Sequence, residues 1–194
     1  MSYFYEYKLK IQQALDNIDV ESIEVFKNRL CDFYSTKRPI LVCGNGGSAA
    51  ISEHLSCDHT KGIGMDTHLS PFVISLPSNV SITTAIANDI GYDHVFSKQI
   101  EWYPRNMSAV FVISSSGNSP NIINALKAAR AKNYVTFAMV GFDGGAVVDE
   151  DLADYIIHVK SNNYGVVEDC HQIIMHCIAQ DLRISNTDLD TLKL

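Results

Sequence analysis

The chain has 194 residues, of which 46% are hydrophobic and 19% charged, with a formal net charge of −7 at pH 7. This length suffices for one domain with a sizeable core. The negative charge, without any basic run, argues against binding nucleic acid or an anionic membrane by bulk electrostatics. No apolar run approaches the roughly 18 residues of a spanning helix, the N-terminus lacks a signal-peptide core, and the five cysteines form no CxxC pair. We therefore expect a cytoplasmic protein with small, buried cysteines.

The N-terminal segment carries apolar side chains at helical spacing in two runs, YFYEYKLKIQQALDNI and DVESIEVFKNRLCDFYS. Asp19 is placed to cap the second helix. We expect a helical hairpin over about 3–36. It either covers one face of a sheet or packs against a neighbouring subunit.

Beyond residue 38 the period changes to short β-rich runs separated by helical stretches. Continuous apolar strands alternating with helices predict a parallel sheet covered on both faces, with an α/β core over about 38–184 and a polar tail over 185–194. In such sheets ligands bind beyond the carboxyl ends of the strands. The expected strands are 39–43, 72–76, 109–114, 134–140 and 155–159, and the expected helices are 48–60, 80–90 with a continuation to about 102, 119–132 and 166–183.

Two loops that follow strands resemble each other chemically. CGNGGSAA, at 43–50, permits close backbone approach at its glycines and places Ser48 near a helix N-terminus. ISSSGNSPNI, at 113–122, offers four hydroxyls at the start of the next helix. Hydroxyls and free amides at a helix N-terminus bind phosphate without lysine, although serine and glycine are also ordinary turn and cap residues. Neither loop has the P-loop or dinucleotide pattern, which disfavours a nucleotide.

The other two loops are less specific. Asp143-Gly144-Gly145 indicates a structural turn after a strand. Asn88 and Asp89 end the helix that begins near residue 80. They are either C-terminal turn residues or ligands for sugar hydroxyls.

Candidate metal and acid–base residues lie on two of the expected helices. His54 and Asp58 are four residues apart and share a face, as a pair of metal ligands would, while His59 is expected on the surface. Glu168 and His176 are separated by about 80° of helical rotation. Glu168 would meet His176 only from a loosened first turn, and both residues have ordinary explanations in the helix dipole and the core.

Together, six segments resemble the phosphoheptose isomerases of the sugar isomerase (SIS) domain superfamily. They are CGNGGSA, EHLSCDHTKG, TAIANDIGYDHVFSKQI, ISSSGNSPNIINALKAA, GFDGG and VEDCHQIIMHCIAQ. The resemblance implies a single SIS domain over 1–194, with a five-stranded parallel sheet flanked by helices. It also implies a homotetramer with active sites between subunits, which interconverts sedoheptulose 7-phosphate and D-glycero-D-manno-heptose 7-phosphate for lipopolysaccharide or other surface glycans.

The resemblance also assigns residues. It implies an enediol-type mechanism in which Asp58 and His176 are the acid–base pair, and one Zn²⁺ per subunit. The implied metal ligands are His54, Asp58, Glu168 and His176. The implied substrate-binding residues are Asn45, Gly46, Gly47, Ser48, Asp58, Asn88, Asp89, Ser114, Ser115, Ser116, Ser119 and Glu168.

The chain departs from the family pattern at two of these positions. The family usually has Glu in place of Asp58 and Gln in place of Glu168. It also often has an acidic residue shortly before that Gln, where this chain has Gly165 and Val166. Two other functions stay open. One is a non-catalytic SIS protein that binds a replication initiator, which would lack a full metal set, and the other is a sugar-phosphate sensor, which would need length for a DNA-binding domain.

Overall fold

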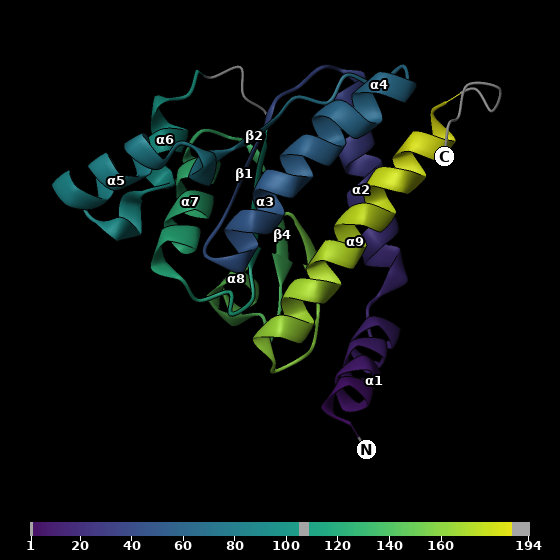
Figure 1. Ribbon diagram of the computed structural model, residues 1–194. Helices are drawn as coiled ribbons and strands as arrows, with labels where there is room; N and C mark the ends of the chain where they lie inside the picture. The colour runs from purple at the N-terminus through teal and green to yellow at the C-terminus, as the bar shows by residue number, and fades with distance from the viewer. Residues whose placement is uncertain (1, 105–108, 188–194) are drawn as a thin grey trace.

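A computed structural model describes residues 2–104 and 109–187 (Figure 1). Its centre is a five-stranded sheet in the order β2-β1-β3-β4-β5. Every neighbouring pair of strands is parallel, and Ile40 is in register with both Val73 and Ala109. This confirms the expected parallel sheet. The strands are β1 (Ile40–Gly44), β2 (Val73–Ser75), β3 (Ala109–Ser114), β4 (Val135–Val140) and β5 (Tyr155–His158).

The helices largely follow the sequence expectation, with two interruptions. The expected 48–60 helix ends at Cys57 and continues as a π-helix, η1 (Asp58–Ile63). The expected 80–102 helix breaks after Asp89, where Gly91 adopts a φ of 133°. No helix in the described ranges has the length and apolar character needed to cross a bilayer. The helices are α1 (Tyr3–Asp16), α2 (Val20–Ser35), α3 (Gly47–Cys57), α4 (Gly64–Asp66), α5 (Val80–Asp89), α6 (Ser97–Trp102), α7 (Pro120–Ala131), α8 (Gly145–Asp149) and α9 (Tyr164–Ser185), with 3₁₀ turns η2 (Leu76–Ser78) and η3 (Tyr92–His94).

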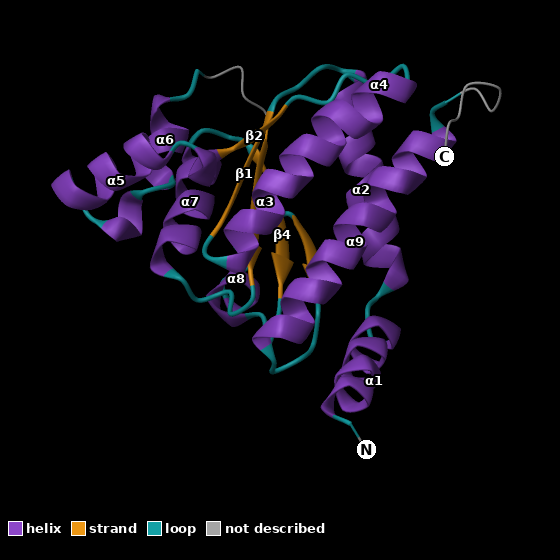
Figure 2. Ribbon diagram, viewed as in Figure 1, coloured by secondary structure: helices purple, strands orange, loops and turns teal. Residues whose placement is uncertain are grey.

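Helices cover both faces of the sheet (Figure 2), because the strand side chains alternate between two apolar cores. On one face, Phe111 and Phe137 meet Phe26 of α2 with ring centroids 5.1 and 4.9 Å apart, and α3 and α9 complete this layer. On the other face, Val110 and Val112 pack under α5, α6, α7 and α8. Both layers place helix N-termini beside the carboxyl ends of the strands.

The N-terminal helices attach to the sheet through α2 and α9. Asp19 caps α2 as expected, since its side chain accepts a hydrogen bond from the Glu21 amide at 3.0 Å. The α1 helix packs against α9, and the Tyr7 hydroxyl donates to Asp169 at 2.7 Å. Figure 1 shows α1 projecting beyond the sheet, so its N-terminal aromatic side chains are largely exposed. Residues 188–194 of the expected tail lie outside the described residues.

The expectation for the cysteines is only partly confirmed. Cys43 and Cys170 are buried, and all five thiols are free. Cys57 and Cys177, however, are exposed on the α3 and α9 helices. They lie on the solvent faces of these helices because the opposite faces fill the core with larger apolar side chains.

Candidate active site

A pocket lies at the carboxyl ends of β1 and β3, between the N-termini of α3, α7 and α9. Both of the loops that the sequence singled out contribute to it, which brings together segments about seventy residues apart in the chain. We call it the serine pocket. It is lined by Asn45, Ser48, Ile113, Ser114, Ser115, Ser116, Ser119, Tyr164 and Glu168.

The loop that follows β3, at 113–122, is called the serine loop, and hydrogen bonds fix its backbone. The Ser114 and Ser116 hydroxyls accept hydrogen bonds from the amides of Gly117 and Asn118, at 3.1 and 3.2 Å. Gly117 has a φ of 64°, and a Cβ there would lie 2.0 Å from the Gly144 carbonyl oxygen. The glycine turn after β4 therefore supports this loop, which confirms its structural role; there the Asp143 carboxylate accepts from the Gly145 amide at 3.1 Å.

One hydroxyl of the loop is buried without a partner. The Ser115 side chain is 6% exposed, and its Oγ has no hydrogen-bond partner among the described residues. Buried hydroxyls are normally bonded, because an unsatisfied one costs about 1–3 kcal/mol. A free hydroxyl in a pocket beside the first turn of α7 is suited to an anionic ligand such as phosphate.

The glycine loop and the serine loop are joined by a pair of amides that the sequence did not single out. Asn45 and Asn121 exchange two hydrogen bonds of 2.9 and 2.8 Å, and Asn121 is only 2% exposed. The Tyr92 hydroxyl also donates to the Asn45 amide oxygen at 3.1 Å. These bonds fix the Asn45 side chain at the edge of the pocket. The sequence signal for Asn121 was its position directly after Pro120, in the first turn of an expected helix.

Glu168 reaches the serine pocket from α9 by packing on Gly47. A Cβ at Gly47 would lie 2.3 Å from the Glu168 carboxylate oxygen, so the absence of a side chain at this position permits the contact. Burial, and secondarily the charge of Asp169, raises the pKa of Glu168. The structure thus places a carboxyl group with a raised proton affinity against the N-terminus of α3 and among the serines.

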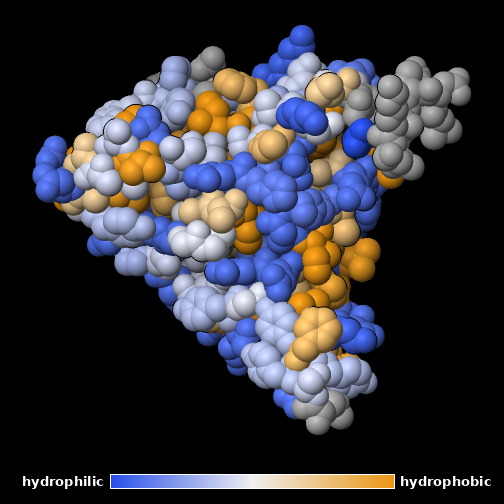
Figure 3. Space-filling model, viewed as in Figure 1, coloured by the Kyte–Doolittle hydropathy of each residue, from blue (hydrophilic) through white to orange (hydrophobic). Residues whose placement is uncertain are grey.

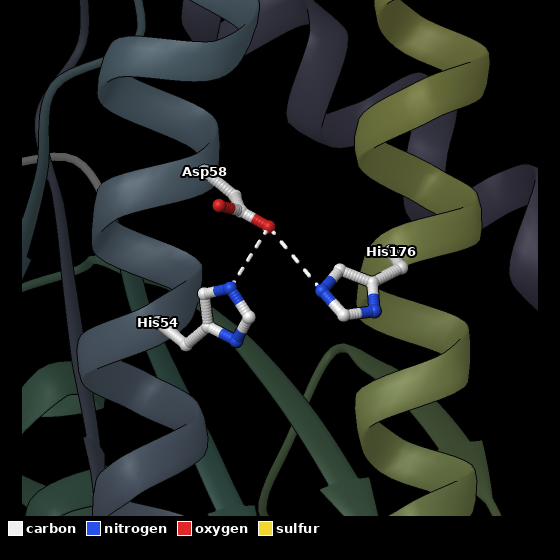
Figure 4. A group of neighbouring side chains, drawn as sticks. All are labelled: His54, Asp58 and His176. Atoms are coloured by element: carbon white, nitrogen blue, oxygen red, sulfur yellow. Dashed lines mark ion pairs between the residues drawn. The ribbon is translucent and has the colours of Figure 1, made fainter.

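A second cluster is formed by His54, Asp58 and His176 (Figure 4). One Asp58 carboxylate oxygen lies 3.3 Å from Nε2 of His54 and 3.4 Å from Nε2 of His176. One potential ligand atom from each residue lies within 4.8 Å of the others. Two imidazoles and a carboxylate are a common ligand set of catalytic metal sites, which keep a further position open. The cluster could therefore hold a metal ion.

This cluster lies on a solvent-facing part of the molecule. The His54, Asp58 and His176 side chains are 47%, 31% and 39% exposed. In Figure 3 the middle of this face is mostly hydrophilic, and apolar residues gather beside it, toward α1. The cluster is thus far less enclosed than the serine pocket.

The prediction that His59 lies on the surface is wrong. His59 is 1% exposed, and its Nδ1 lies 2.6 Å from the Tyr34 hydroxyl of α2. Burial lowers the pKa of His59 to about 3. The chain becomes π-helical at Asp58, and the wider turn changes the angle between successive side chains from the α-helical value used for the prediction.

Glu168 lies outside this cluster, because α9 begins earlier than expected. Asn163 caps the helix by accepting from the Val166 amide at 3.1 Å, so Glu168 lies in regular helix and not in a loosened turn. The residue one turn later, Gln172, instead contacts both imidazoles, with its amide nitrogen 2.9 Å from Nδ1 of His54 and 3.2 Å from Nε2 of His176. Gln172 was not among the site residues predicted from the sequence, although it lies midway between Glu168 and His176.

Asn88 and Asp89 lie at the exposed end of α5. The Asn88 amide donates to the Asp89 carboxylate at 2.7 Å. Asp89 lines a separate, mainly apolar hollow with Ile86 and Trp102, not the serine pocket. Their role in sugar binding stays a prediction.

Comparisons with known proteins agree with the fold. The SIS domain family matches residues 3–141. The chain is 32% identical to a phosphoheptose isomerase of Synechocystis over 94% of this chain and 93% of that protein. It is similar to the structure of phosphoheptose isomerase from Neisseria gonorrhoeae, with a TM-score of 0.80 and 32% identity over 93% of this chain and 94% of that one. A phosphoheptose isomerase from Francisella tularensis gives a TM-score of 0.83 at 25% identity, over 94% and 95% of the two chains.

Proposed function

This chain belongs to the phosphoheptose isomerase family of SIS-domain proteins, and we propose that it interconverts sedoheptulose 7-phosphate and D-glycero-D-manno-heptose 7-phosphate. One observation supports this most strongly. A hydroxyl-lined pocket and a His–Asp–His cluster lie along the same helix, α9, with Glu168 at the first and His176 at the second. A phosphorylated sugar that is held at one end is thereby presented to acid–base groups at the other.

The serine pocket binds the phosphate in this proposal. The hydroxyl of Ser115, which has no partner among the described residues, and the other loop serines supply hydrogen-bond donors to an anion. Ser48 at the first turn of α3 adds another hydroxyl. Because these groups are fixed before the substrate arrives, binding energy at the phosphate positions the reacting carbons.

The residues of the cluster fit a zinc ion. His54, Asp58 and His176 supply three ligands of the types that catalytic zinc prefers, and a fourth position is left for substrate or water. When bound there, zinc would act as a Lewis acid on the sugar carbonyl and stabilise the developing negative charge. The sequence assigned the fourth position to Glu168; we propose that its carboxyl meets the substrate in the serine pocket.

The chemistry of the reaction is a proton transfer between adjacent carbons. A base removes a proton from the carbon next to the carbonyl, and an acid protonates the carbonyl oxygen to give an enediol. Protonation of the former carbonyl carbon and loss of the neighbouring hydroxyl proton complete the isomerisation without gain or loss of atoms. We assign these transfers to Asp58 and His176, whose facing atoms are 3.4 Å apart.

We further propose a cytoplasmic homotetramer with active sites between subunits. The free thiols support a reducing compartment. The exposed aromatic side chains of α1, with Tyr3 at 67% and Phe4 at 77%, and the openness of the His–Asp–His cluster support burial by a neighbouring subunit. Light scattering on the purified protein measures the oligomeric state directly.

The function is tested by metal analysis of purified protein together with a coupled assay on sedoheptulose 7-phosphate. We expect about one zinc per chain and turnover that a chelator removes and zinc restores. Bound zinc without turnover would indicate a different sugar phosphate. The absence of both would favour the binding-protein alternative.

A further inference from the structure

Gln172 bridges the two imidazoles of the His–Asp–His cluster, whose ring centroids are 4.9 Å apart. Its amide nitrogen lies 2.9 Å from Nδ1 of His54 and 3.2 Å from Nε2 of His176. Both distances are within hydrogen-bond range, and they join α9 to α3 directly. Asp58 is the other described side chain near both rings, with one carboxylate oxygen 3.3 and 3.4 Å from their Nε2 atoms.

The backbone under Gln172 is fixed by the core. Val167, Ile174 and Ile178 are buried on the opposite side of α9, with exposures of 0%, 3% and 3%. Gln172 itself is half-buried and points toward α3. Its amide therefore has little freedom to leave the histidines without a change of side-chain rotamer.

The contact to His54 determines which ring nitrogen of that residue can bind a metal. Nε2 of His54 faces Asp58, while Nδ1 faces Gln172. A neutral imidazole that binds a metal through Nε2 carries its proton on Nδ1 and needs an acceptor there. The two ends of an amide have nearly the same shape, so a half-turn of the last side-chain bond brings the Gln172 oxygen to Nδ1. The 3.2 Å contact to Nε2 of His176 then has to open when that nitrogen binds a metal, because neither atom can donate a proton to the other.

From this geometry we infer that Gln172 is a positioning residue, whose amide oxygen accepts the His54 Nδ1 proton and thereby directs Nε2 into the metal centre. The inference rests on the proposed metal centre and gives two residues of α9 different roles. Gln172 organises the centre, and Glu168, one turn earlier, faces the serine pocket. Metal affinity should thus depend on Gln172 more than on Glu168.

The test measures zinc affinity by competition with a chromophoric chelator for the wild type and for Gln172→Leu, Gln172→Glu and Glu168→Ala. Loss of a hydrogen-bond partner of a metal-binding histidine weakens metal affinity by about 10- to 100-fold, and we expect this for Gln172→Leu. Gln172→Glu keeps an acceptor and should restore affinity to within about threefold of wild type or better. Glu168→Ala should also stay within about threefold, although its turnover falls.

Three outcomes decide the matter. Weakened binding in Gln172→Leu, with rescue by Gln172→Glu, supports the inference, and melting of the metal-free variants shows whether each has folded. Equal affinity of wild type and a folded Gln172→Leu overturns it while the proposed function stands, as does loss of zinc in Glu168→Ala alone. A wild-type protein that binds no zinc overturns the metal centre and this inference together.

Discussion

The serine pocket and the His–Asp–His cluster are built in opposite ways. The pocket is made from loop backbone that is buried and hydrogen-bonded, and supported by the glycine turn after β4. The cluster is made from side chains of two helices, each about a third to a half exposed. The proposed anion site is therefore formed when the sheet folds, whereas the proposed reactive groups depend on side-chain contacts between α3 and α9. Substitutions in the two regions should therefore have different kinetic signatures.

The largest effect should come from the cluster. His176→Ala removes one of the proposed acid–base groups and should lower turnover by about 10²-fold or more. KM should change little, because the phosphate-binding loop is untouched. A coupled assay gives both constants, and the thermal midpoint is the control for folding. A variant with turnover near that of wild type would remove His176 from the chemistry.

Ser115→Ala tests the pocket. Loss of one hydrogen bond to a charged group costs about 1.5–3 kcal/mol, so kcat/KM should fall by about 10-fold or more. The free energy of unfolding should stay constant or rise, because the buried hydroxyl has no partner among the described residues. Ser116→Ala is the matched comparison. Its hydroxyl accepts a hydrogen bond from the Asn118 amide, so this variant, unlike Ser115→Ala, should lower the free energy of unfolding. An unchanged kcat/KM in Ser115→Ala would place the phosphate elsewhere.

Asn121→Ala tests the link between the two substrate loops. It breaks both amide bonds to Asn45 and should lower the free energy of unfolding by about 1–3 kcal/mol while raising KM. Asn124→Ala, one turn along α7, removes an exposed hydrogen bond to the Asp93 carbonyl and should have a smaller effect. Denaturant unfolding and the coupled assay measure the two quantities. Equal losses in both variants would show that the amide pair has no special role.

The pH dependence of the free energy of unfolding tests the core side of α9, the helix that contributes residues to both regions. Burial lowers the pKa of His171, on the core side of α9, to about 4. Because the unfolded chain takes up this proton near pH 6.5, the contribution of His171 to stability is full above that value and falls by at most about 1.4 kcal/mol per pH unit as pH drops toward 4. His171→Leu cannot bind the proton, so its unfolding free energy should depend less steeply on pH. The same slope in both proteins would contradict this.

Much of the fold was predictable because local physics dictates it. The β-rich apolar runs gave all five strands to within one or two residues, since strands buried on both faces need continuous apolar sequence. The break after Asp89 was harder, because Gly91 is only one residue in a long helical pattern. The π-helix at Asp58 has no reliable sequence signature, so the burial of His59 was missed.

The candidate site likewise contains some features that local sequence predicts and others that it does not. The sequence by itself determined the two loops and the His54–Asp58 pair, because turns, caps and four-residue spacing are properties of neighbouring residues. Only the tertiary structure decided that Gln172 contacts both imidazoles while Glu168 packs on Gly47. These contacts join segments more than a hundred residues apart, and their geometry depends on where α9 begins and how closely it approaches α3, which no local pattern contains.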